Sequence, residues 1–143
     1  MATVELRFSP LPEHVRTARL VAAAVARRSG VDEAVLDEVR LAVGEACSRA
    51  VGLHQAGGIT APVRVSLIEE EKQFSIEVGD EAPRAAAETP GAPDAADDLE
   101  AEGEDEMGLA VISGLVDDVE VTADADGGLI RMSWPTLPAT LLP

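Results

Sequence analysis

Apolar and polar positions recur along the chain with two different periods. A spacing of three or four residues, typical of an amphipathic helix, runs through residues 12–29, 33–54 and 107–115. A spacing of two, typical of a half-buried strand, runs through residues 3–9, 63–69, 74–78, 119–122 and 129–134. The second and third of these strands are separated by a short turn, which predicts an antiparallel hairpin.

The second predicted helix is the longest and organises the rest of the chain. Asp32 is placed to cap its first turn, and Cys47 lies on its apolar side, where we expect a small core residue. Glu45 and Arg49 interrupt the apolar stripe. Because they lie four residues apart, we expect them to share one face of the helix and to form an ion pair. His54, near the helix end, is expected to act as a charge partner of the helix dipole.

The order of these elements predicts an α+β protein, a two-layer sandwich in which a mixed or antiparallel sheet carries helices on one face. We expect a single domain over residues 1–135 and a C-terminal tail at residues 136–143. Residues 81–106 lack apolar periodicity and hold ten acidic residues against one arginine. Such a segment buries too little apolar surface to offset the entropy of ordering it, so we expect an acidic mobile lid.

The composition narrows the classes of partner and compartment. Hydrophobic residues make up 46% of the chain but aromatic residues only 2%, so the core must be aliphatic. The formal net charge of −16 argues against binding to nucleic acid or an anionic membrane surface, and suits a partner with a basic patch. The sequence shows no signal-peptide pattern and no membrane-length apolar run, so we expect a cytoplasmic protein. Two histidines and one cysteine, widely spaced, predict no metal site.

Several short motifs occur in an order that points to a family. They are FSPLPEHVRTARL at residues 8–20, VGEACSRAV at 43–51, IEVGDEAP at 76–83, EMGLAVISGLVDDVEV at 106–121 and GGLIRMSWP at 127–135. Together they resemble the anti-sigma-factor serine kinases, a branch of the GHKL (histidine-kinase-like) ATPases. The resemblance covers nearly the whole chain and implies a Bergerat-type, histidine-kinase-like ATPase fold.

The resemblance also implies roles for individual residues. In the family, a glutamate is the general base that activates a serine of an antagonist protein, and an asparagine four residues later holds Mg²⁺. An aspartate contacts the adenine, and glycines let the backbone approach the phosphates. The resemblance thus implies Glu45 as the catalytic base, and it implies cofactor-binding positions at Arg49 (the magnesium position), Asp80 (adenine) and Gly108 (phosphates).

A partner-binding position is implied on the first helix. The family carries an arginine there that contacts both the sigma factor and its antagonist, and the resemblance implies that Arg19 has this role. Arg16 lies three residues earlier on the same side of the predicted helix. The alternative for both arginines is an ordinary solvated helix face.

The chain departs from the family pattern at four positions of the nucleotide site. Arg49 replaces the asparagine, and a guanidinium has no acceptor with which to ligate Mg²⁺. Ala82 and Arg84 stand where two glycines are expected, and Glu106 places an anion where phosphates belong. These changes predict that catalysis is lost and that no cofactor is bound. ATP and Mg²⁺ are expected only if the site is functional.

We therefore expect an anti-sigma-factor-like regulator of transcription, a pseudokinase that binds a sigma factor, a STAS-type anti-anti-sigma factor, or both. A homodimer remains open. One alternative is an active serine kinase that uses ATP to phosphorylate the anti-anti-sigma factor. A second alternative is a scaffold that has lost sigma-factor binding and only titrates the antagonist.

Overall fold

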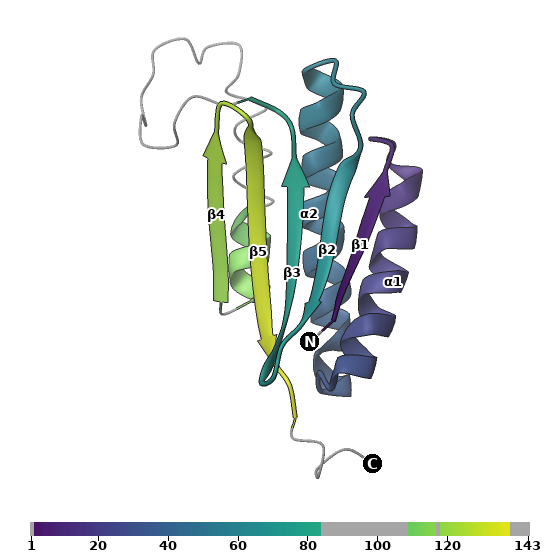
Figure 1. Ribbon diagram of the computed structural model, residues 1–143, viewed down its shortest axis with the longest axis vertical. Helices are drawn as coiled ribbons and strands as arrows, with labels where there is room; N and C mark the ends of the chain where they lie inside the picture. The colour runs from purple at the N-terminus through teal and green to yellow at the C-terminus, as the bar shows by residue number, and fades with distance from the viewer. Residues whose placement is uncertain (1, 84–108, 117, 138–143) are drawn as a thin grey trace.

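The computed structural model describes residues 2–83, 109–116 and 118–137 (Figure 1). In this part of the chain an open sheet is covered by helices. The elements are β1 (Thr3–Phe8), α1 (Glu13–Ser29), the short 3₁₀ turn η1 (Glu33–Val35), α2 (Leu36–Ala56), β2 (Val63–Glu69), β3 (Gln73–Asp80), β4 (Asp118–Asp124) and β5 (Gly127–Pro135). Residues 109–115 form a further short helix.

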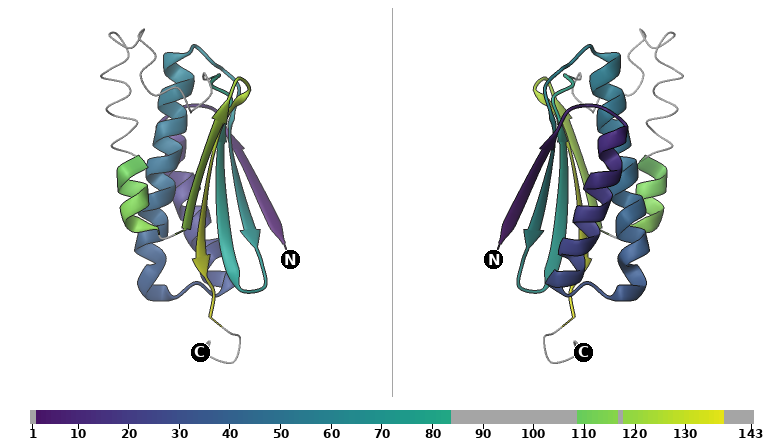
Figure 2. Two further views of the ribbon diagram at one scale, coloured as in Figure 1. Left: turned by 90° about the vertical axis from the view of Figure 1, so that its left-hand side faces the viewer. Right: turned by 90° about the vertical axis from the view of Figure 1, so that its right-hand side faces the viewer.

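The five strands lie in the order β1-β2-β3-β5-β4, and every neighbouring pair is antiparallel. Figure 2 shows α1, α2 and the helix at residues 109–115 on the same face of the sheet, and the opposite face carries no described helix. The predicted two-layer α+β sandwich is therefore confirmed, with the antiparallel rather than the mixed form of the sheet.

The core lies between the two layers and is largely aliphatic, as the composition predicts. Ile76 of β3 and Met132 of β5 are paired on adjacent strands, and both are fully buried. Val39 and Val43 of α2 pack onto the same cluster. Each such side chain contributes about 1.5–3 kcal/mol through burial. Trp134, the only tryptophan, is 4% exposed and stacks on Phe74 at the end of this core.

The organising helix begins three residues later than its pattern predicts. Asp32 does act as a cap, since its Oδ1 accepts a hydrogen bond from the backbone N–H of Ala34 at 3.1 Å. That bond tightens residues 33–35 into the 3₁₀ turn, so α2 proper starts at Leu36. Cys47 is fully buried on α2, and burial raises the pKa of its thiol to about 12.

Polar contacts fasten the end of α1 to the end of β2. One carboxylate oxygen of Glu69 accepts hydrogen bonds from Arg28 Nη2 at 3.0 Å and from Ser29 Oγ at 2.9 Å. Both hydrogen bonds lower the pKa of Glu69, and the bond from Arg28 has the larger effect. Nearby, the first residues of the predicted tail are also fixed, because the N–H of Leu137 donates to the carbonyl of Gly30 at 2.8 Å.

Two expectations fall on parts of the chain that are not described. Most of the predicted lid, residues 84–106 of 81–106, and the last six residues of the predicted tail, 138–143, lie outside the described residues. Within the described part of the chain, no helix has the length and apolar character needed to cross a membrane.

Candidate functional site

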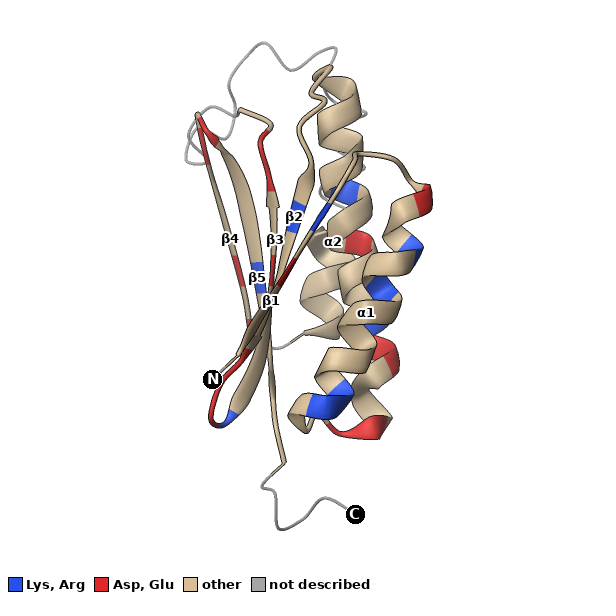
Figure 3. Ribbon diagram, turned by 45° about the vertical axis from the view of Figure 1, so that its right-hand side comes forward, with Lys and Arg blue, Asp and Glu red and all other residues tan. Residues whose placement is uncertain are grey.

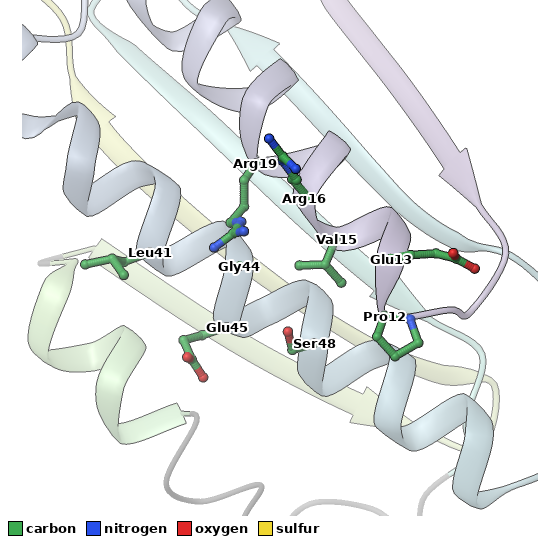
Figure 4. Close-up of a pocket in the computed structure, with 9 residues that line it drawn as sticks. All are labelled: Pro12, Glu13, Val15, Arg16, Arg19, Leu41, Gly44, Glu45 and Ser48. Atoms are coloured by element: carbon green, nitrogen blue, oxygen red, sulfur yellow. The ribbon is translucent and has the colours of Figure 1, made fainter.

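A groove of about 490 Å³ runs between α1 and α2 (Figure 4). It contains three of the residues that the sequence singled out, because Arg16, Arg19 and Glu45 all line it. The remaining lining residues are Pro12, Glu13, Val15, Leu41, Gly44 and Ser48. The position implied for the general base and the positions implied for partner contact therefore share one groove.

Small side chains make up part of the buried faces of the two helices that form this groove. Ala18 and Ala22 of α1 and Ala42 and Ala46 of α2 are each at most 2% exposed. Alanine loses no side-chain entropy on burial and lets helix backbones approach closely. The long charged side chains of the two helices that line the groove are two arginines and two glutamates.

The two arginines that line the groove differ from the other arginines of α1 in their ion pairs. Arg27 and Arg28, near the end of the helix, each lie 3.0 Å from a glutamate carboxylate. Arg16 and Arg19 are exposed and form no ion pair with any described residue. Figure 3 shows basic positions, in blue, spread along α1. Arg16 and Arg19 are therefore exposed positive charges in a chain of net charge −16.

The expected ion pair between Glu45 and Arg49 is wrong. The ion pairs between described residues do not include it, although both residues lie on α2 one turn apart. Both side chains are half-buried, so packing against neighbouring elements, rather than helix periodicity, sets their directions. Glu45 lines the groove with Arg19, whereas Arg49 is not among the residues lining it.

Asp80 lies at the end of β3 and is 3% exposed. Its Oδ1 accepts a hydrogen bond from the backbone N–H of Ala82 at 3.0 Å. The residue between them is fixed as well, since the N–H of Glu81 donates to Nε2 of His54 at 2.8 Å. The last turn of α2 therefore holds the backbone directly after the residue that the resemblance places at the adenine.

His54 is not the helix-end charge partner that the sequence suggested. It is fully buried, and its Nδ1 lies 2.9 Å from the carbonyl oxygen of Ala61. Because Nε2 accepts from Glu81, Nδ1 must be the donor, and the contacts assign a neutral imidazole. Nothing in the local sequence marks this role, because the two partners lie 7 and 27 residues along the chain.

The other implied site residues are not placed by the structure. Gly108, together with the departures at Arg84 and Glu106, lies outside the described residues. Ala82 is described, and its side chain is 6% exposed, so a methyl group occupies buried space where the family pattern has a glycine.

The resemblance places Arg49 at the magnesium position of the family, and this side chain does not suit that role. The guanidinium of Arg49 offers only donors, so it cannot replace the oxygen ligand that Mg²⁺ requires at that position. Within the described ranges, no group of three or more His, Cys, Asp or Glu side chains is placed to hold a metal ion. Asp80 keeps the carboxylate that the resemblance assigns to adenine, but one of its oxygens is engaged by the backbone.

Comparison with known protein families agrees with this architecture. Residues 8–134 match the family model described as the histidine kinase-like ATPase domain. This match covers most of the chain, so the chain belongs to the histidine kinase-like ATPase family, within the GHKL superfamily. No curated protein matches it.

Among solved structures, a similar fold is found in the crystal structure of the RsbU and RsbW domains of Rv1364c from Mycobacterium tuberculosis. The TM-score is 0.69 at 16% sequence identity, and the comparison covers 97% of this chain and 33% of that chain. The present chain thus spans about a third of the length of that protein. At this identity the likeness shows the fold alone.

Proposed function

We propose that this protein is a partner-switching regulator that acts by binding protein partners in the groove between α1 and α2. The partners proposed are a sigma factor, a STAS-type anti-anti-sigma factor, or both in turn. Phosphotransfer is not part of the proposed activity. The observation that carries the proposal is that Arg16 and Arg19 line one groove with Glu45 and have no ion-pair partner among the described residues.

The groove suits a protein partner better than a small ligand. It is an open surface furrow between two helices and mixes apolar side chains with both signs of charge. Leu41 in the groove wall is 53% exposed, and Leu20 on the neighbouring turn of α1 is 57% exposed. Exposed leucines beside arginines that lack a carboxylate partner are the composition expected of a protein interface.

The residue at the implied magnesium position supports a protein that binds its partners but does not catalyse phosphotransfer. Phosphoryl transfer depends mainly on positioning and on charge neutralisation by Mg²⁺. The resemblance places Arg49 at the magnesium position, where its guanidinium cannot coordinate the ion. A regulator of this family that keeps its interface but lacks this ligand would hold its partners without phosphorylating them.

The test is a capture experiment with the purified chain on a solid support and cytoplasmic extract from the native cell. We expect a sigma factor or a STAS-type protein to be retained by the wild-type chain. Arg19→Glu should weaken the binding of the retained partner by about 2 kcal/mol or more, as the loss of a charge contact in an interface does. Affinity is then measured with the purified partner by calorimetry.

Lys72→Glu provides a control with the same change of charge. Lys72 is exposed in the turn between β2 and β3, away from the groove. The partner should bind this variant like the wild type. Equal loss in both variants would show a general effect of net charge, and equal retention by Arg19→Glu would exclude the groove as the interface.

A further inference from the structure

Arg19 reaches the groove by crossing the backbone of α2 at a glycine. Figure 4 shows its side chain extending from α1 toward Gly44. A Cβ built on Gly44 would lie 2.8 Å from Cδ of Arg19 and 3.5 Å from Cγ. Such a Cβ contact is too close for any side chain, so the stem of Arg19 occupies space that is open only because residue 44 has no side chain.

We propose that Gly44 is a positioning residue for Arg19. The bare backbone at Gly44 forms a saddle over which the methylene groups of Arg19 lie, and this contact directs the guanidinium into the groove. The three atoms nearest to a Cβ at Gly44 all belong to Arg19, and none belongs to Arg16. The saddle thus restricts one of the two exposed cations before any partner binds, which lowers the entropy lost on binding.

This inference rests on the proposed function, because it concerns how Arg19 is presented to the partner in the groove. Glu13 and Glu45 also line the groove, so its two carboxylates balance its two guanidinium groups. The direction in which Arg19 is held therefore matters for the partner, since a guanidinium pairs only with a group that meets its planar fork of donors.

The helix offers a matched pair of variants. Gly44→Ala and Gly52→Ala make the same change within α2, but a Cβ at Gly52 has nothing within 4 Å. Both substitutions increase helix propensity by a similar amount. Since the nearest neighbour of Gly44 is the exposed side chain of Arg19 and not backbone, Gly44→Ala should move Arg19 and leave the fold intact.

The first measurement needs no partner. Nitrogen-15 relaxation of the Arg19 Nε–H group is recorded in the wild type and both variants, with Arg16 as the internal reference. We expect Arg19 to be more rigid than Arg16 in the wild type, to become as mobile as Arg16 in Gly44→Ala, and to be unchanged in Gly52→Ala. Equal mobility of the two arginines in the wild type, or no change in Gly44→Ala, would overturn the proposal.

The second measurement uses the partner purified in the capture experiment. Gly44→Ala should weaken its binding about tenfold, Gly52→Ala should not, and Gly44→Ala should have no further effect in an Arg19→Ala background. If Arg19→Ala weakens binding and Gly44→Ala does not, the positioning role of Gly44 is wrong. If relaxation shows the expected change but Arg19→Ala binds normally, the proposed interface is wrong and the saddle still stands.

Discussion

Gly127 lies directly against the carbonyl group of Asp80, at the point where β3 passes the hairpin that joins β4 to β5. Asp80 is paired with Gly128 in the sheet, and Gly127 begins β5 with a φ of 138°. A Cβ at Gly127 would overlap the carbonyl oxygen of Asp80. The backbone of Asp80 is therefore packed on a position that no side chain can occupy.

We predict that Gly127→Ala destabilises the fold by more than about 3 kcal/mol, because it combines a steric overlap with backbone in an unfavourable φ region. The free energy of unfolding is measured by urea titration. Fluorescence of Trp134 reports the transition, since this single tryptophan is 4% exposed in the core.

Gly58→Ala is the matched control for this effect. Gly58 also has positive φ, 65°, but a Cβ there has nothing within 4 Å. Its substitution should cost only about 1–2 kcal/mol, the strain of a left-handed alanine. Similar losses of stability in Gly58→Ala and Gly127→Ala would mean that the contact with Asp80 adds nothing to the cost of substituting Gly127.

His54→Leu should destabilise the protein by about 2–4 kcal/mol. Leucine removes the acceptor for the N–H of Glu81 and the donor for the carbonyl of Ala61, and it leaves both backbone groups without these partners. Hydrogen exchange of the Glu81 amide should increase relative to amides in β2. The measurement is again urea unfolding, and an unchanged midpoint would contradict the bridge that the structure shows.

His14→Gln serves as the comparison for His54. His14 is half-buried near the start of α1, and its ring lies 6.2 Å from that of Phe8. Loss of this single ring contact should change stability by about 1 kcal/mol or less. The two histidines of the chain are thus expected to differ clearly in their effect on folding.

The thiol of Cys47 should be unreactive in the folded protein. Burial raises its pKa from 9.0 to about 12, so almost no thiolate is present near pH 8. We expect reaction with a colorimetric disulfide reagent to be at least about a hundredfold slower in the native protein than in urea. Native reactivity that rises between pH 7 and 9 as it does in urea would contradict this.

The raised pKa of Cys47 also determines the direction in which the free energy of unfolding changes with pH. Between about pH 9 and pH 12 the unfolded chain loses the thiol proton while the folded chain keeps it. The native state then binds more protons than the unfolded state, so the free energy of unfolding should fall as the pH rises through this window. Cys47→Ala should remove this contribution, which urea titrations at several alkaline pH values would detect.

ATP binding is expected to be weak or absent and to be no tighter with Mg²⁺ than without it. The reason is that Arg49 cannot ligate the ion and Ala82 fills buried space near Asp80. Calorimetric titration with ATP, with and without Mg²⁺, measures this directly. Incubation with labelled ATP and the captured antagonist then tests for phosphotransfer.

Two results would separate the alternatives for the nucleotide site. Magnesium-dependent binding in the micromolar range, or label on an antagonist serine, would overturn the binding-only function and make Glu45 a working base. Binding that ignores Mg²⁺ and disappears in Arg49→Ala would instead show that the guanidinium takes the place of the ion as a built-in cation.

The sequence by itself determined the elements and the class of fold. Periods of two and of three to four residues locate the described strands and α1 and α2 to within a few residues, because burying one face of each element is the main driving force of folding. Asp32 could be identified as a cap because a cap bonds to a backbone group only two residues away. The buried position of Cys47 also follows from its place in the apolar stripe.

Only the tertiary structure decided the relationships between distant segments. The antiparallel order of the sheet, the bridge from His54 to Glu81, and the contact of Gly127 with Asp80 join residues whose spacing in sequence carries no signal. The expected Glu45–Arg49 pair failed for the same physical reason. Helix geometry places two side chains on one face, but for half-buried groups the packing of neighbouring elements decides which partner each side chain meets.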